Sequence, residues 1–308
     1  MSIKNQKPIP PKQEILDFAL GLNIDLVRFT EASILKDEQS RFESWIGKGF
    51  NAGMGWLEHN TEKRFNPAVL LEGAKTVISI AVSYNSDMAH GIISRYAAGA
   101  DYHKIIKSKL NQIESFMKRD DPGLKSKACV DASVISEKSF GAKSGIGWVG
   151  KNSILINEDL GSWFYLGELV IVREYEPDPP VIDGCGECTA CISACPTGAI
   201  NSDKTINSRK CISYMTIEDK NCNDPKEAAE NNYRSVYGCD ICQEACPWNK
   251  GAVMTREAAF LKPNGLYLMS RESLSRLDPD EFDSLSKGTC FDRISYEKFR
   301  SNLDVLTF

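Results

Sequence analysis

The first third of the chain alternates between helical and strand-like hydrophobic patterns. Apolar residues recur at helical spacing over residues 11–21 and stop at Gly21, and residues 24–29 then alternate like a short strand. A second helix is predicted from Ser40 to Lys48. The run from Thr76 to Tyr84 is apolar and β-branched, as in a strand buried on both faces. This order of elements predicts an α/β domain.

A longer helix is predicted to begin after Asp101, which is a good helix cap, and to stop before Pro122. Its apolar positions repeat over five turns. Its other face carries five basic residues: Lys104, Lys107, Lys109, Lys118 and Arg119. Such a face is either a solvated surface or a contact for nucleic acid.

Residues 127–131 read as a strand that ends in the carboxylate of Asp131, and a helix through Glu137 to Lys143 follows. Two more strands are predicted at residues 153–156 and 163–172. Asp131 is either a site residue or the N-terminal cap of the following helix. In a site, burial would raise its pKa and let it hold a proton near neutrality.

Two glycine-rich segments punctuate this domain. Residues 49–56 form a turn that is either a helix stop or a close approach to a ligand. Gly145, Gly147 and Gly150 match the dinucleotide-binding fingerprint, but they follow a helix and lead into a strand, the reverse of the required order. A nicotinamide site is therefore not expected, and a backbone cradle for another large cofactor stays open.

Composition narrows the classes of protein that remain. The 308 residues are 42% hydrophobic, and the formal net charge of −5 gives no overall basic signal for nucleic acid. No segment reaches the roughly 18 apolar residues of a membrane span, and the N-terminus lacks the apolar core of a secretion signal. We therefore expect a cytoplasmic protein without membrane contact. A proline-rich linker near residues 176–180 marks one boundary, and the segment after Lys250 is polar and helix-prone but too short for an independent domain. We therefore expect three parts: residues 1–176, residues 177–250, and a helical tail at residues 251–308 that packs on the other two.

The cysteines carry the strongest chemical signal. Cys185-x2-Cys188-x2-Cys191-x3-Cys195-Pro196 has the bacterial ferredoxin spacing for a [4Fe–4S] cluster, whose fourth cysteine binds a second cluster. A second run, Cys239-x2-Cys242-x3-Cys246-Pro247, ends in the same way but lacks one cysteine.

The crossed ferredoxin rule therefore divides the ligands into two sets. The first set is Cys185, Cys188, Cys191 and Cys246, and the second set is Cys195, Cys239, Cys242 and either Cys211 or Cys222. Cys211 is favoured because it lies closer to Cys195. Disulfides and zinc are the competing interpretations. Cys129, Cys290 and the unused member of the Cys211/Cys222 pair are read as packing thiols.

Several blocks together resemble the epoxyqueuosine reductase family over nearly the whole chain. They are the tripeptide Asp101-Tyr102-His103, Val130-Asp131 with Glu137, the segment from Gly145 to Asn152, the segment from Cys211 to Glu218, and the segment from Cys239 to Asn249. The resemblance implies an oxidoreductase that uses cobalamin and two [4Fe–4S] clusters to reduce epoxyqueuosine to queuosine at the wobble position of tRNA anticodons. It implies an α/β (α+β) cobalamin-binding domain joined to a ferredoxin-like two-cluster domain.

Carried over by position, the resemblance implies that Asp131 is the proton donor and that Cys211 completes the second set. It places Ser213, Tyr214 and Asp240 on the cofactor side, with Met54 and Ser153 as further cobalamin contacts. His103 either lines the site or is a helix-start histidine whose hydrogen bonds are satisfied locally.

The chain also departs from the family pattern. Val134 stands where the family commonly has proline, and no C-terminal helical-repeat extension follows Phe308. The expected partners are a tRNA anticodon stem-loop carrying epoxyqueuosine and an external electron donor such as a flavodoxin or ferredoxin, and we expect a monomer. A corrinoid dehalogenase and a simple electron carrier are the alternative functions.

Overall fold

A four-stranded antiparallel sheet forms the centre of the protein in the computed structural model, which describes residues 9–88, 91–131, 134–220 and 235–306. The strand order is β1-β2-β6-β3. The bounds are Leu26–Glu31 for β1, Thr76–Ser83 for β2, Ser126–Cys129 for β3 and Phe164–Ile171 for β6. The predicted strands are confirmed at these places. All three pairings are antiparallel, so the predicted α/β class takes its α+β form here.

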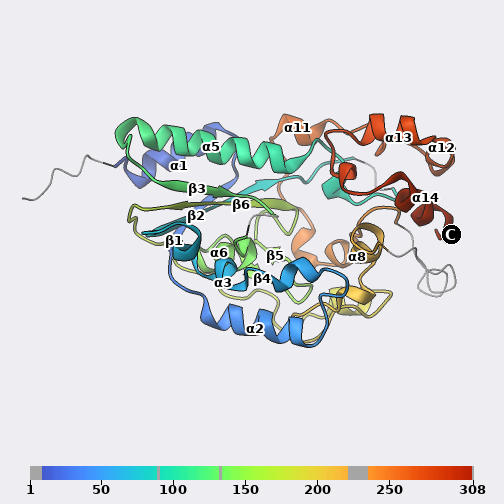
Figure 1. The fold of residues 1–308 in the computed structure, drawn as a ribbon, viewed down its shortest axis with the longest axis horizontal. Coiled ribbons are helices and arrows are strands. Elements are labelled where there is room, and N and C mark those ends of the chain that lie inside the picture. Colours follow the sequence, from blue (N-terminus) through green and yellow to red (C-terminus); the bar gives the residue numbers. More distant parts are fainter. Residues whose placement is uncertain (1–8, 89–90, 132–133, 221–234, 307–308) are drawn as a thin grey trace, which may run out of the picture.

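The two central strands are almost fully buried because helices cover both faces of the sheet. α1 (Lys12–Gly21) and α5 (Tyr102–Asp120) lie on one face, as Figure 1 shows. α6 (Glu137–Lys143) packs against β2 and β6 from the other face. Burial on both sides explains why these strands are apolar at most positions, without the alternation of a half-exposed strand.

The smaller helices of the N-terminal half lie on the α6 side of the sheet (Figure 1). They are α2 (Lys36–Gly47), α3 (Thr61–Phe65) and α4 (Pro67–Leu70). α2 begins at Lys36, four residues before the predicted start at Ser40. Its first turn is charged and buries no side chain, so the hydrophobic pattern gave no signal for those residues.

Helix α5 follows the prediction closely, but its basic residues do not form one solvated face. Asp101 accepts a hydrogen bond from the backbone N–H of His103 and caps the helix. Lys109 is only 6% exposed, and its Nζ atom binds Glu257 at 2.5 Å. Lys118 pairs with Glu114. A charged side chain is buried only with a partner, so the expectation of five exposed cations was wrong at Lys109.

Among the described residues of the cysteine-rich segment there are three short α-helices. They are α7 (Ala190–Ala194), α8 (Ile212–Ile217) and α10 (Ile241–Glu244). α7 and α10 pack together, which brings the two cysteine runs side by side although about fifty residues separate them in sequence.

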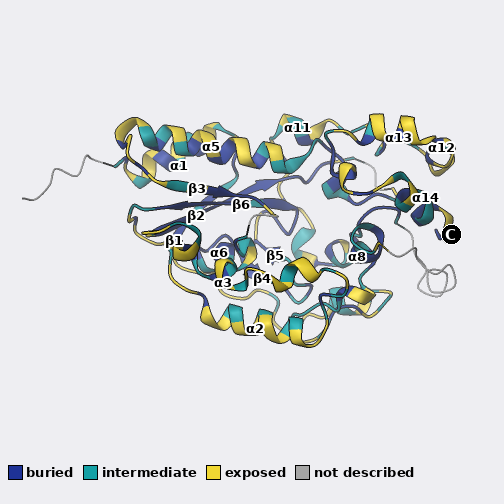
Figure 2. Cartoon of the chain, in the orientation of Figure 1, coloured by how far each residue is buried: buried dark blue, intermediate teal, exposed yellow. Residues whose placement is uncertain are grey.

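The C-terminal segment is helical, as its composition predicted. Its helices are α11 (Ala258–Leu261), α12 (Arg271–Arg276), α13 (Pro279–Ser286) and α14 (Tyr296–Asp304). The inner faces of α12, α13 and α14 form a hydrophobic cluster with Ile93 and Ala97 from the first half of the chain and with Val236 and Tyr237. Phe260 of α11 packs instead in the core beside α5 and the sheet. Figure 2 shows this burial as dark inner faces under exposed outer turns. The tail therefore packs against both preceding segments.

A short hairpin, β4 (Trp148–Val149) and β5 (Leu155–Ile156), occupies the glycine-rich segment that resembles a dinucleotide fingerprint. A Cβ atom on Gly147 would come within 2.1 Å of the carbonyl oxygen of Ile156. Glycine is therefore required for the two hairpin strands to approach each other, and the segment opens no helix. In the described part of the chain, no helix is long and apolar enough to cross a membrane.

Candidate functional site

Asp131 lies in a loop just after the edge strand β3, with its side chain 43% exposed. Its backbone φ of 46° is in the left-handed region, which non-glycine residues seldom adopt. The residue in the capping position of α6 is Ser136. The alternative interpretation of Asp131 as a helix cap was therefore wrong. Strained backbone of this kind often occurs at functional sites.

A line of three polar side chains runs from the start of α5 to Asp131. The Nε2 atom of His103 lies 2.8 Å from Oδ2 of Asp131, and the Nδ1 atom lies 2.7 Å from Oδ1 of Asp101. The ring also stacks on Tyr102, with centroids 4.1 Å apart. Of the two interpretations of His103, the structure therefore favours a residue of the site. Both ring nitrogens face carboxylates, an arrangement that favours the protonated imidazolium.

The protonation of this pair differs from the sequence-based expectation. Burial raises the pKa of Asp131, but the hydrogen bond and charge of His103 outweigh burial and hold that pKa below its ordinary value. The hydrogen bond to Asp131 raises the pKa of His103, against the opposing effect of burial. The expected upward shift for Asp131 was therefore wrong. The proton of the pair resides on His103, from which Asp131 can receive it.

The first turn of α6 fixes the loop that carries Asp131. The Oε1 atom of Glu137 accepts a hydrogen bond of 2.6 Å from the backbone N–H of Asp131. Burial, and then the charge of Asp131, raise the pKa of Glu137 to about 8. The next residue, Lys138, donates 2.8 Å to the carbonyl oxygen of Ser153 at the tip of the β4–β5 hairpin. Ser153 also has a left-handed φ of 60°, so one helical turn holds two strained loops.

Glu168 lies in the middle of β6 and is completely buried. It stands opposite Ser79 on β2 and Cys129 on β3. Burial, and then the charge of Glu137, raise its pKa well above the ordinary value. A second protonated carboxyl group therefore lies behind Glu137 in the core.

The predicted cofactor-side residues of α8 lie against the first glycine-rich turn. The hydroxyl oxygen of Tyr214 accepts a hydrogen bond of 2.8 Å from the backbone N–H of Gly53. A Cβ atom on Gly53 would approach that oxygen to 2.7 Å, so a larger residue here would have to displace the Tyr214 hydroxyl. Met54 packs in the same hydrophobic cluster as Tyr214 and Cys211. Ser213, next to Tyr214, is half-buried.

Asp240, the remaining cofactor-side candidate, is buried, and both of its carboxylate oxygens accept hydrogen bonds from other residues of the protein. One carboxylate oxygen accepts a hydrogen bond from the hydroxyl of Ser94, and the other accepts one of 2.7 Å from the backbone N–H of Arg95. Asp240 therefore fixes the 94–95 turn against the second cysteine run. A cofactor contact from this residue stays a prediction.

The four cysteines of the first set line one hollow. The rest of the lining is largely apolar and includes Ile156, Pro247 and Trp248, with Lys151 and Asn152 at the hairpin tip. Burial, and then the charges of Cys185 and Cys246, raise the pKa of Cys191. These thiols are thus close enough to interact, as ligands of one cluster must be.

The second set is also brought together. Burial and the charges of neighbouring thiols, Cys239 and Cys211 first, raise the pKa of Cys242 well above its ordinary value. The charge of Cys195 contributes to the raised pKa of Cys211. Cys222, the alternative to Cys211, lies outside the described residues. Cys129 and Cys290 are buried, as expected of packing thiols.

The donor set fits [4Fe–4S] clusters. All eight predicted thiols are free, and they fall into two neighbouring groups. Within the residues that the structure describes, no three potential ligands converge on a point that could hold a single ion. Ligands of a cubane bind four separate irons and stand further apart than those of one ion, so this spacing suits a cluster.

Two residues of the site carried too weak a sequence signal to be selected. Arg293, from the C-terminal tail, pairs with Glu218 beside α8 at 2.5 Å, and its charge also lowers the pKa of Asp131. Nothing in the sequence near Arg293 suggested a site. Glu168 could have been noticed, because a glutamate in the middle of an apolar strand is unusual.

Comparisons with known proteins agree with this arrangement. Residues 64–132 match the family described as "Epoxyqueuosine reductase QueG, DUF1730", and residues 184–249 match a "4Fe-4S double cluster binding domain". The first match ends just past Asp131, and the second contains all eight predicted cluster ligands.

Proteins of known name show the same likeness over most of the chain. The epoxyqueuosine reductase of Cellulophaga algicola is 36% identical over 281 residues, covering 90% of this chain and 92% of that protein. The Escherichia coli epoxyqueuosine reductase is 33% identical, with 95% and 79% covered.

Solved structures give the same answer for the fold. The crystal structure of an epoxyqueuosine reductase with an epoxyqueuosine-modified tRNA-Tyr stem loop has a TM-score of 0.88 at 28% identity, covering 96% of this chain and 80% of that chain. The Streptococcus thermophilus enzyme has a TM-score of 0.86 at 30% identity, with the same coverage. The chain described here belongs to the epoxyqueuosine reductase family.

Proposed function

We propose that this protein reduces epoxyqueuosine to queuosine in the anticodon loop of tRNA. The observation that supports it most strongly is the position of Asp131, which is held by His103 and Glu137 in a partly exposed site. The eight thiols that can bind two clusters belong to the same compact fold. Proton delivery and electron delivery are therefore both available in one chain of this family.

The reaction consumes two electrons and two protons. Reduction of the epoxide to an alkene breaks both bonds between carbon and the epoxide oxygen, and that oxygen leaves as water. Cobalamin, when bound, supplies the low-potential cobalt centre that passes electrons to the epoxide carbon. Met54, Ser153, Ser213 and Tyr214 are our candidates to hold it. Met54 and helix α8, which carries Ser213 and Tyr214, lie beside the second cysteine set, and Ser153 is hydrogen-bonded to the helical turn that holds Asp131.

Asp131 delivers a proton to the departing oxygen. Its Oδ2 atom is hydrogen-bonded to His103, so the carboxylate takes the proton that resides on His103 and passes it to the substrate oxygen. Glu137 holds the backbone of Asp131, and Asp101 orients the ring of His103. The substrate oxygen thus meets an acid whose position is fixed from two sides.

Electrons enter at the first cysteine set. Cys188 is exposed there, whereas the second set lies beside α8 and the first glycine-rich turn. An external donor such as a flavodoxin or ferredoxin would dock near Cys188. The interaction between Cys191 and Cys242 marks the place where the two clusters approach each other.

The tRNA presents its modified base to the side where Asp131 is exposed. Sequence-specific RNA recognition usually takes an unstacked base from a loop. Arg293 is the cation that lies near Asp131, although Glu218 pairs with it. The outer residues of α5 remain candidates for phosphate contact, without Lys109. We place the enzyme in the cytoplasm, where tRNA and reduced thiols coexist, and expect a monomer.

The test has two stages. Anaerobically reconstituted protein is first analysed for iron, sulfide and corrin absorbance, with about eight irons per chain expected for two [4Fe–4S] clusters. It is then reduced and incubated with tRNA that carries epoxyqueuosine, and the nucleosides are measured by mass spectrometry. We expect queuosine to replace epoxyqueuosine. An unchanged nucleoside pool with fully loaded, reduced enzyme would overturn the proposal.

A further inference from the structure

The β4–β5 hairpin reaches across from the N-terminal half and covers the hollow of the first cysteine set. At its tip, the Nζ atom of Lys151 donates to the carbonyl oxygens of Gly186 and Cys188 at 2.7 and 2.9 Å. Asn152 and Ile156 line the hollow together with the four thiols. The hairpin is therefore part of the wall of the first cluster site.

Two N–H donors on this hairpin are buried and have no acceptor among the described residues. They are the Nδ2 atom of Asn152 and the Nε1 atom of Trp148. The two residues are 1% and 7% exposed, respectively. The Oδ1 atom of Asn152 accepts from the backbone N–H of Ile154 at 3.3 Å, which fixes the end of the amide that remains free. Buried unpaired donors are rare in native proteins, so each calls for an acceptor.

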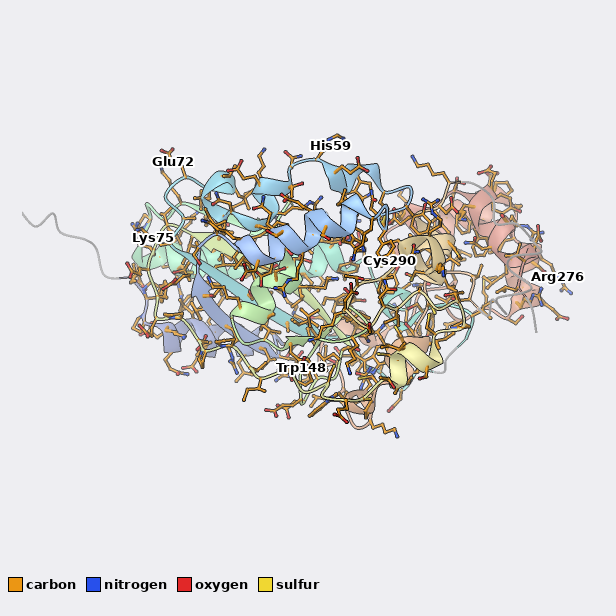
Figure 3. The ribbon with its side chains drawn as sticks, turned by 90° about the horizontal axis from the view of Figure 1, so that it is seen from below. His59, Glu72, Lys75, Trp148, Arg276 and Cys290 are labelled. Carbon is orange, nitrogen blue, oxygen red and sulfur yellow. The ribbon has the colours of Figure 1, made fainter. Side chains whose placement is uncertain are left out.

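Trp148 lies next to the thiols as well. It shares a hydrophobic cluster with Ile156 and Cys246, against which Cys185 and Trp248 pack. Its ring meets that of Trp248 edge to face, with centroids 5.0 Å apart. The two indoles differ in one respect. The Nε1 atom of Trp248 donates to the carbonyl oxygen of Gly184 at 3.2 Å, whereas that of Trp148, labelled in Figure 3, has no such partner.

We infer that Asn152 and Trp148 donate hydrogen bonds to sulfur atoms of the cluster that the first cysteine set binds. Loading brings cluster sulfides into this hollow and converts the four cysteine thiols that line it to thiolates, so both kinds of sulfur can accept. Hydrogen bonds to sulfur stabilise the more negative, reduced cluster and so raise its reduction potential. The inference rests on the proposed two-cluster function and assigns the hairpin a part in setting the potential of the electron-entry cluster.

The same hairpin also carries Ser153, whose carbonyl oxygen is held by Lys138 beside Glu137. The segment that covers the cluster is therefore tied to the helical turn that positions Asp131. Residues 150–154 thus form a direct structural link between the first cluster and the acid.

The test uses redox titration of the reconstituted protein, followed by electron paramagnetic resonance. Trp148→Phe removes one donor and keeps an aromatic ring, and Asn152→Leu removes the other donor together with the Oδ1 acceptor of the Ile154 N–H. Trp248→Phe is the matched control, because it removes an indole N–H that a backbone carbonyl already accepts. A Cys188→Ser variant identifies the signal that belongs to the first cluster.

We expect the midpoint of the first cluster alone to fall in Trp148→Phe and in Asn152→Leu. A tenfold change in the equilibrium constant for reduction corresponds to about 59 mV for a one-electron couple. Trp248→Phe should keep both midpoints.

Unchanged midpoints in the two loaded variants would show that a buried water accepts from these donors, and would overturn the inference. An equal shift in Trp248→Phe, or loss of the cluster in both variants, would assign a packing role instead and overturn it equally. Wild-type protein that fails to bind two clusters would instead contradict the proposed function.

Discussion

The region around Asp131 and the region of the eight cluster cysteines differ in what they need besides the protein chain. The first is held by side chains of the protein alone, whereas the second needs iron and sulfide. Asp131 already has its partners, since His103 binds its carboxylate at 2.8 Å and Glu137 binds its backbone at 2.6 Å. The cysteines instead have free thiols, and burial raises the pKa of Cys239 to about 12. Thiols in that state must lose their protons to bind iron.

The comparison shows that proton delivery and electron delivery depend on different sets of residues. The protein preorganises proton delivery through hydrogen bonds from His103 and Glu137 to Asp131. Electron delivery becomes complete only when the clusters bind. Substitutions should therefore remove one function and leave the other measurable.

The largest expected effect comes from a cluster ligand. Cys242→Ser should lose the second cluster, lower the iron content by about half and abolish turnover, since clusters of this type need their four thiolates. Iron analysis and nucleoside mass spectrometry measure the two effects. Cys129→Ser is the control, because this buried thiol lies outside both sets and should leave the iron content unchanged. Full iron content in Cys242→Ser would contradict the assignment.

A smaller effect is expected at Glu137. Glu137→Ala removes the acceptor for the backbone of Asp131, and misplacing a catalytic group by about 1 Å can cost on the order of 100-fold in rate. Glu137→Gln keeps an oxygen acceptor and resembles the neutral carboxyl that a pKa of about 8 implies at neutral pH, so it should stay close to wild type. Steady-state kinetics would separate them. Equal losses in the two variants would argue against this positioning role.

The pH dependence should follow the His103–Asp131 pair. The raised pKa of His103 keeps the pair protonated through pH 6.5, its ordinary value, and turnover should fall as pH rises through the shifted value. The same shift stabilises the fold below pH 6.5, and this contribution is lost over the same alkaline range. His103→Gln should lower kcat and remove this limb from the pH–rate profile. An unchanged limb in that variant would assign it to another group.

The smallest effect concerns Glu168, behind the region around Asp131. Because its folded-state pKa is raised above about 4.3, its contribution to stability declines as pH rises from that value. Glu168→Gln removes this dependence. The melting temperature of the variant minus that of the wild type should therefore increase between pH 6 and pH 8.5, by on the order of a few °C. The exposed Glu158→Gln serves as control. A difference in melting temperature that does not change with pH would contradict the raised pKa of Glu168.

The features that the sequence predicts well are those encoded locally. Cysteine spacing within each run, the cap of α5 at Asp101 and the buried strand β2 depend on neighbouring residues. The pKa of Asp131 does not, because it is set by His103, 28 residues away in the chain. Lys109 was likewise expected on an exposed face but is buried, because its partner Glu257 lies 148 residues further on in the chain.

The role of the glycine-rich hairpin also depended on distant contacts. Its sequence excluded a dinucleotide site through the order of elements, but the first cysteine loop that it covers begins some thirty residues later. Only the folded chain brings Asn152 and the four thiols around one hollow.

The most direct test of the separation between acid and electron delivery is a single-turnover reaction of Asp131→Asn. The variant is loaded with cobalamin and both clusters, reduced, mixed with tRNA that carries epoxyqueuosine, and quenched for nucleoside mass spectrometry beside the wild type. We expect cobalamin and the clusters to be bound and reduced as in the wild type. Queuosine should form at about one hundredth of the wild-type rate or below. Queuosine formation at the wild-type rate would contradict the account.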